Sequence, residues 1–110
     1  MSPNYSNTKI YMLYNNDRDI SDIYIGYSTN IKDRMCVHRR CCNNPKNKSY
    51  TTRMYNFIRN NGGWEKWSYR IIEELNCSSK KEAEKKEEFW IKYYNPSLNT
   101  NKKIIKYNIK

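Results

Sequence analysis

Runs of hydrophobic residues separated by polar clusters predict three β-strands. The run at residues 9–14 is rich in β-forming side chains and ends at a cluster of Asn and Asp, which favours a turn. A shorter run at residues 23–26 follows, and we expect these two strands to form a hairpin. Residues 67–74 show the same pattern after a pair of glycines and predict the third strand.

Three other segments repeat hydrophobic residues at helical spacing. Residues 31–42 follow a capping asparagine, and residues 50–60 precede the two glycines. A serine–glutamate capping box begins a third helix, which runs to about residue 94 before a proline. The inward faces predicted for the first two helices are Ile31, Met35, His38 and Cys42, and then Tyr50, Met54, Phe57 and Ile58.

The element order β-β-α-α-β-α predicts one α/β domain of the α+β type, in which helices flank a three-stranded, mainly antiparallel sheet. A chain of 110 residues with 37% hydrophobic residues can bury one modest core. We expect an N-terminal extension at residues 1–8, the domain at residues 9–100 and a basic tail at residues 101–110. The sequence contains no long apolar run and no secretory signal pattern, so we expect an intracellular protein without membrane segments.

Positive charge is concentrated in the middle of the chain. The formal net charge is +10, and residues 34–70 alone carry nine basic side chains and one acidic. A basic segment interleaved with aromatic residues attracts a nucleic-acid backbone, although an ordinary solvated surface is the alternative. The candidate nucleic-acid contacts are Arg39, Arg40, Arg53 and Arg59 for phosphates, and Tyr27 and Trp64 for stacking, with local packing as the alternative for these two rings.

One acidic residue stands out in the third predicted helix. On a helical wheel Glu87 lies within the apolar arc of Ala83, Trp90 and neighbouring residues, whereas Glu88 points away. A carboxylate directed at a core is costly unless a cation or a metal ion meets it. A structural salt bridge with Arg34 or another basic residue is the alternative.

Several motifs follow one another in a fixed order along the chain. They are KIY at residues 9–11, YIG at residues 24–26, Arg34 and His38 one helical turn apart, Glu87 before an aromatic run, and Asn99 after Pro96. This ordered set spans nearly the whole chain and resembles the GIY-YIG nuclease family. The first triplet departs from the family at Lys9, where the family has a glycine that matters for the backbone.

The resemblance implies a metal-dependent endonuclease that hydrolyses DNA and leaves a 5′-phosphate and a 3′-hydroxyl. In this family the glutamate that matches Glu87 holds one divalent cation, Mg²⁺ or Mn²⁺. We expect the site on the sheet face beneath the first and third helices. The implied roles are general base for Tyr11, orientation of the attacking water for Tyr24, phosphate stabilisation for Arg34, a hydrogen bond to a phosphate oxygen or to Tyr11 for His38, and positioning for Asn99.

The ordinary pKa of a tyrosine is ~10, so a basic Tyr11 needs a lowered pKa or help from a metal-bound water network. A lowered pKa would come from cations such as Arg34, which favour the phenolate. We expect duplex or branched DNA as the partner and a monomer or weak dimer as the acting form. The role implied is of the homing, mobile-element or repair type, and the richness in Asn, Lys, Ile and Tyr is typical of an AT-rich viral or mobile-element source.

Three other interpretations remain open at this stage. The first is a catalytically inactive nucleic-acid-binding module with the same fold. The second is a protein that binds or cuts RNA. The third is a zinc site, built from some of the four cysteines with His38. However, no C-x-x-C pair exists, so we expect free, mostly buried thiols.

Overall fold

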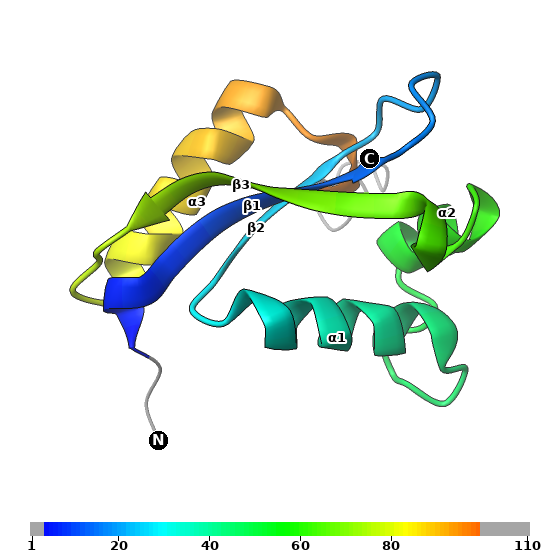
Figure 1. Cartoon of the computed structure of the whole chain (residues 1–110), viewed down its shortest axis with the longest axis horizontal. Helices are drawn as coiled ribbons and strands as arrows, with labels where there is room; N and C mark the ends of the chain where they lie inside the picture. Colours follow the sequence, from blue (N-terminus) through cyan, green and yellow to red (C-terminus); the bar gives the residue numbers. More distant parts are fainter. Residues whose placement is uncertain (1–3, 100–110) are drawn as a thin grey trace, which may run out of the picture.

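The three predicted strands join into one antiparallel sheet with the order β2-β1-β3 (Figure 1). The strands are β1 (Thr8–Asn15), β2 (Tyr24–Ser28) and β3 (Trp67–Leu75). The central strand β1 pairs with both neighbours, and a bulge shifts its register with β3 between Ile10 and Tyr11. This computed structural model describes residues 4–99, and the predicted basic tail at residues 101–110 lies outside them.

Three α-helices complete the predicted order, so the fold class is confirmed. They are α1 (Ile31–Asn43), α2 (Arg53–Asn60) and α3 (Lys80–Tyr94), with 3₁₀ helices at Tyr5–Asn7, Trp64–Lys66 and Ser97–Asn99. The start of α2 differs from the prediction, which placed it at residue 50. The residues before it form successive turns, and the Tyr50 ring stacks on the guanidinium of Arg59, 3.6 Å from the ring centroid.

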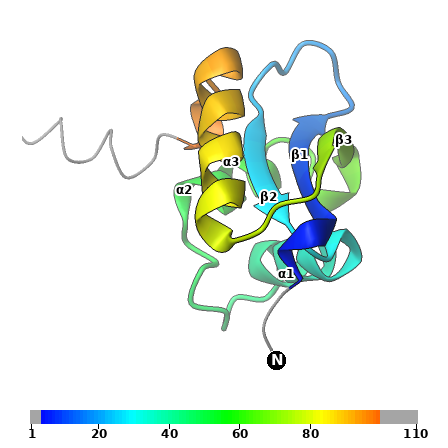
Figure 2. The ribbon, with the colours of Figure 1, turned by 90° about the vertical axis from the view of Figure 1, so that its left-hand side faces the viewer.

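The helices cover opposite faces of the sheet (Figures 1 and 2). Tyr11 and Leu13 of β1 pack with residues of α1 and α2, whereas Ile10 and Met12 pack with residues of α3. Alternate residues of a strand point to opposite faces, so one strand serves both clusters. The expectation that the first and third helices lie over the same face is therefore wrong.

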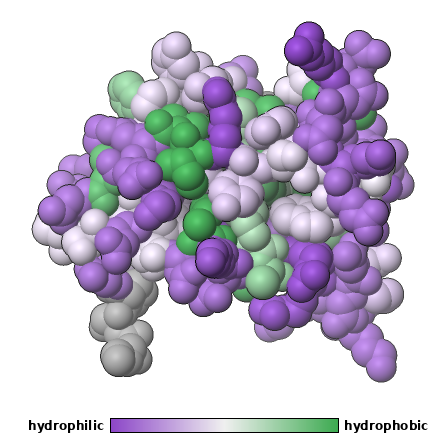
Figure 3. Space-filling view, in the orientation of Figure 1, coloured by the Kyte–Doolittle hydropathy of each residue, from purple (hydrophilic) through white to green (hydrophobic). Residues whose placement is uncertain are grey.

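The face seen in Figure 3 is mostly hydrophilic, and its apolar patches lie mainly beside β3, where it crosses α3. Phe89 and Tyr93 of α3 are exposed. Both rings contact Trp90, with ring centroids 5.2 and 5.4 Å from it, so they form one aromatic group on α3.

Within residues 4–99, no helix is long and apolar enough to cross a membrane.

Candidate active site

Two tyrosines and the imidazole of His38 meet on the sheet face that α1 covers. Tyr11 of β1 and Tyr24 of β2 project to this face, and their ring centroids lie 6.2 Å apart. His38 reaches them from α1, with its ring centroid 5.9 Å from that of Tyr11 and 5.8 Å from that of Tyr24. Residues that are 27 positions apart in the chain thus form one aromatic cluster.

The glycine of the YIG motif makes room for this cluster. Gly26 lies opposite Tyr11 in the sheet, and a Cβ atom at Gly26 would lie 2.7 Å from the Tyr11 hydroxyl oxygen and 2.9 Å from Cε2 of Tyr24. Both phenols would have to move. At the other motif, Lys9 occupies the family's glycine position as an ordinary strand residue without a positive φ angle, so this departure introduces no backbone strain there.

His38 is almost completely buried, with 3% of its surface exposed. Its Nε2 lies 2.8 Å from the Tyr11 hydroxyl, and its Nδ1 lies 2.7 Å from the hydroxyl of Tyr55. Of the two predicted partners of His38, the structure therefore contains the tyrosine. Both ring nitrogens are already engaged, which leaves neither for a phosphate oxygen. Burial, with a smaller effect from Arg34, lowers the pKa of His38 to about 4, so the imidazole is neutral near pH 7.

The hydroxyls of the two strand tyrosines are held in their protonated form. Burial is the main cause that raises the pKa of Tyr11, the proximity of Tyr24 adds to it, and the Arg34 guanidinium lowers it by less. Burial and Glu87 likewise raise the pKa of Tyr24, again against Arg34. Arg34 is thus one of the cations expected to favour the Tyr11 phenolate, but its effect is smaller than that of burial. Removal of the Tyr11 proton needs further stabilisation of the phenolate.

Glu87 reaches the same region from α3, past the open edge of β2. The side chain is half-buried, and the backbone N–H of Tyr27 donates to its carboxylate. Burial, reinforced by Glu84, raises the pKa of Glu87 to about 7. The neighbouring Glu88 is exposed, as the helical wheel predicted. No ion pair within 4 Å joins Glu87 to Arg34 in the described structure, which disfavours the structural salt bridge.

Asn99 holds the edge strand rather than lining the aromatic cluster. Its side-chain amide donates to the carbonyl of Ile25 over 2.8 Å and accepts from the N–H of Ile25 over 2.8 Å. Asn99 thus satisfies the N–H and the carbonyl of Ile25 at the outer edge of β2, where no further strand pairs. Asn99 and Glu87 also line one hollow of about 540 Å³ beside α3.

The donor set suits a hard cation and not zinc. Among residues 4–99, no group of three or more His, Cys, Asp or Glu side chains is placed to hold a metal ion. The four cysteines are free thiols, and all except Cys36 are buried, as expected. Mg²⁺ often binds through one or two carboxylates, with waters and substrate phosphates as the other ligands. A half-buried carboxylate whose charged form is disfavoured, such as Glu87, fits such an ion.

Arg34 is the positive charge shared by the cluster. Its side chain is exposed, and it shifts the pKa values of Tyr11, Tyr24, His38 and Glu87. An exposed guanidinium that acts on all of these groups is placed to meet a phosphate from outside.

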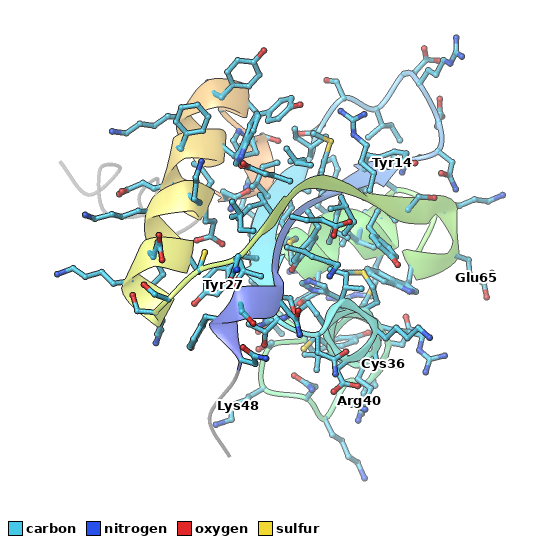
Figure 4. The ribbon with its side chains drawn as sticks, turned by 60° about the vertical axis from the view of Figure 1, so that its left-hand side comes forward. Tyr14, Tyr27, Cys36, Arg40, Lys48 and Glu65 are labelled. Carbon is cyan, nitrogen blue, oxygen red and sulfur yellow. The ribbon has the colours of Figure 1, made fainter. Side chains whose placement is uncertain are left out.

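The other predicted contact residues divide into two groups. Arg39 and Arg40 are exposed on α1, where Figure 4 labels Arg40 beside Cys36. Tyr27 is half-buried and packs against Ile10 and Ile25 on the α3 face, as the packing alternative predicted, although it also lines a hollow of about 480 Å³ with Arg34. Arg53 is exposed but donates to the Ser97 carbonyl over 2.9 Å.

Arg59 and Trp64 make internal contacts. Arg59 donates to the backbone carbonyls of Cys42 and Tyr50 and to Asn56, and so joins α1 to α2. The ring of Trp64 stacks on His38, with centroids 5.9 Å apart, so the packing alternative holds for this residue.

Tyr55, the second partner of His38, was not among the residues that the sequence pointed to. Tyr55 is buried in α2 and lies three residues before the buried Ile58. That i, i+3 spacing was the available signal, but it indicates burial only. The contact with His38 depends on how α1 and α2 pack together.

Comparison with known proteins gives one match. The family model of the GIY-YIG catalytic domain matches residues 7–103, which is nearly the whole chain. No curated protein and no solved structure matches the chain.

Proposed function

The chain belongs to the GIY-YIG family of nucleases, and on that premise we propose that it is a divalent-metal-dependent endonuclease that hydrolyses DNA phosphodiester bonds. The observation that carries this proposal is the electrostatic coupling in the cluster. Tyr11, Tyr24 and Glu87 each have a raised pKa, and Arg34 opposes the shift in each. A group of perturbed ionisable residues around one exposed cation is typical of a reaction centre.

Substrate binding would begin at Arg34. Its guanidinium would donate to oxygens of the scissile phosphate and stabilise the negative charge that develops there. Exposed Arg39 and Arg40 would add contacts to neighbouring phosphates, which makes affinity sensitive to salt. Tyr27 would contact the nucleotide that occupies the hollow beside Arg34.

Tyr11 would act as the general base in its phenolate form. It would take one proton from a water molecule that Tyr24 orients. The water oxygen would form the new bond to phosphorus while the bond from phosphorus to the 3′ oxygen breaks. Solvent would protonate that oxygen, so the products would be a 5′-phosphate and a 3′-hydroxyl. His38 would hold Tyr11 by their hydrogen bond.

Glu87 would hold Mg²⁺ or Mn²⁺, which, when bound, supplies positive charge next to the phosphate and the leaving oxygen. This assignment is supported by the half-buried position of the Glu87 carboxylate. Asn99 would keep β2, and with it Tyr24, in place.

A plasmid assay tests the reaction. Supercoiled DNA incubated with the protein and Mg²⁺ is expected to be nicked or linearised, and a chelator is expected to prevent this. Glu87→Gln is expected to abolish cleavage, whereas Glu88→Gln, one residue further on the exposed face, is expected to retain it. If the protein binds DNA but cleaves it with none of the divalent metal ions tested, the inactive binding module would instead be supported.

Arg34→Ala separates turnover from affinity. Turnover is expected to disappear while DNA affinity falls modestly, because Arg39 and Arg40 remain. The control Arg40→Ala is expected to weaken binding and leave the rate of the bound complex unchanged. An equal loss of turnover and affinity in Arg34→Ala would contradict its role at the scissile phosphate.

The substrate distinguishes the biological roles. We propose that the protein acts inside the cell, as a monomer or weak dimer, on duplex or branched DNA of a homing, mobile-element or repair process. Cleavage of duplex, branched and single-stranded oligonucleotides, with an RNA hairpin as a fourth substrate, ranks these roles. Preference for branched DNA would support the repair type, and preference for RNA would overturn the assignment to DNA.

A further inference from the structure

The buried imidazole of His38 is held between two phenols, and only one of them belongs to the family motifs. Tyr11 lies at Nε2, and Tyr55, which the proposed mechanism does not use, lies at Nδ1. Both tyrosines are buried, with 1% and 7% of their surface exposed. Because Tyr55 contacts His38, the partner of the proposed general base, it can influence the protonation of that base.

The two nitrogens of a neutral imidazole are not equivalent. One carries a proton and donates, and the other has a lone pair and accepts. His38 is neutral near pH 7, because its pKa is about 4. Therefore one of the two phenols donates to the ring and the other accepts from it. The direction of these two hydrogen bonds decides whether Nε2 donates a proton to the Tyr11 oxygen or accepts one from it.

The surroundings of Tyr55 favour donation to Nδ1. Its hydroxyl is buried and remains protonated, because burial and the adjacent Cys41 thiol raise its pKa. A buried hydroxyl proton needs an acceptor. Nδ1 of His38, 2.7 Å away, is a strong acceptor, whereas sulfur is a weak one. The ring proton then belongs on Nε2.

The same direction satisfies the other end of the chain of hydrogen bonds. Nε2–H donates to the hydroxyl oxygen of Tyr11 over 2.8 Å. The Tyr24 ring centroid lies 6.2 Å from that of Tyr11, and the Tyr11 hydroxyl lowers the pKa of Tyr24, which fits Tyr24 as the acceptor of the Tyr11 proton. A donor order from Tyr55 to His38, Tyr11 and Tyr24 thus gives the hydroxyl protons of Tyr55 and Tyr11 an acceptor each.

We propose that Tyr55 is a positioning residue that keeps the proton of His38 on Nε2, so that the imidazole donates to the Tyr11 oxygen and stabilises its phenolate. A hydrogen bond to the charged form of a group favours that form. With the opposite tautomer, Nε2 would accept from Tyr11 and favour the neutral phenol, which is the wrong form for a base. The catalytic part of this inference rests on the proposed function, whereas the tautomer does not.

The tautomer can be observed directly, because His38 is the only histidine in the chain. In protein labelled with ¹⁵N-histidine, NMR at neutral pH is expected to show a protonated Nε2 and a bare Nδ1. Tyr55→Phe keeps the ring and removes the donor, so the spectrum is expected to shift towards a mixture of tautomers. Tyr50→Phe, which removes a hydroxyl from the ring stacked on Arg59, is the matched control and is expected to leave the spectrum unchanged.

Kinetics give the second readout. Loss of one buried hydrogen-bond donor in Tyr55→Phe is expected to lower kcat roughly tenfold and leave KM unchanged. Tyr50→Phe is expected to change neither. Thermal unfolding and circular dichroism of both variants check that the fold is retained.

Three results separate the possible failures. A wild-type ring protonated on Nδ1, or a spectrum and kcat that Tyr55→Phe does not alter, would overturn the proposal. If the wild type cleaves no DNA but has the Nε2–H tautomer and loses it in Tyr55→Phe, the positioning by Tyr55 stands. In that case the proposed nuclease function is the part that fails.

Discussion

The two faces of the sheet are built from the same strands but differ in chemistry. On the face that α1 covers, Tyr11, Tyr24 and His38 form a buried cluster of polar aromatic groups. On the face that α3 covers, Ile10 and Met12 lie in a cluster of aliphatic and aromatic side chains. The alternation of side chains along β1 places Tyr11 and its polar partners, beside apolar residues such as Leu13, on one face and a cluster of apolar residues on the other.

Burial of side chains has different energetic consequences on the two faces. Burial of the aliphatic cluster is favourable in proportion to the apolar area removed from water. Burial on the α1 face shifts pKa values, because it disfavours the charged forms of Tyr11 and His38. The comparison predicts that substitutions in the Ile10 cluster of the α3 face change mainly stability. Substitutions in the cluster of Tyr11, Tyr24 and His38 on the α1 face are expected to change mainly activity.

Tyr11→Phe is expected to have the largest effect, on turnover. Loss of a general base lowers kcat by ~10²–10⁴-fold. The ring remains in place, but Nε2 of His38 loses its buried partner, so the unfolding free energy is expected to fall by ~1–3 kcal/mol. Plasmid cleavage and urea unfolding measure the two quantities. Tyr69→Phe, at an exposed position of β3, is the control and is expected to cleave normally. Full activity of Tyr11→Phe would remove the distinction between the faces.

Ile10→Ala tests the opposite face. Ile10 is fully buried, and truncation of such a side chain destabilises a protein by ~2–5 kcal/mol. The kcat of the folded fraction is expected to stay near that of the wild type. Urea unfolding gives the first value and cleavage at a temperature well below the transition gives the second. A large loss of kcat with unchanged stability in Ile10→Ala would contradict the expected difference between the two faces.

Acidification is expected to act through His38. Its pKa falls from 6.5 in the unfolded chain to about 4 in the folded one, so folding favours the neutral ring. This contribution to stability is complete above about pH 6.5 and is lost as the pH falls towards 4. His38→Gln lacks the titrating group and serves as the reference.

Between neutral pH and about pH 4.5, the wild type is expected to lose about 2 kcal/mol more unfolding free energy than His38→Gln. Glu87 has the opposite sign, because its pKa is raised, but both proteins contain it and its effect cancels. Urea unfolding at the two pH values is the measurement. An NMR titration of the imidazole near pH 6.5 would contradict the expectation.

Asn99→Ala is expected to have the smallest effect, which is confined to the edge of β2. The variant removes both hydrogen bonds to Ile25, which costs ~1–2 kcal/mol. Hydrogen exchange of the Ile25 amide is expected to accelerate, while exchange in the central strand at Met12 stays slow. Unchanged exchange at Ile25 would show that β2 needs no support from Asn99.

The sequence by itself determined the elements and their order. Hydrophobic periodicity and capping residues are local signals, and they placed the three strands, α1 and α3 within one or two residues. They failed at the start of α2, where turns closed by backbone hydrogen bonds replace the first helical turn and Tyr50 stacks on Arg59. The same local pattern found the inward direction of Glu87, because a helical wheel needs no tertiary information.

The tertiary structure alone decided which of these residues meet. It placed α1 and α3 on opposite faces, used the donors of Arg59 to join two helices, and brought Tyr55 to His38. It also showed that the Tyr11 phenol lies over Gly26 and leaves no room for a side chain there. Contacts of this kind join residues far apart in the chain, and their distances follow from the packing of whole elements, which no local pattern encodes.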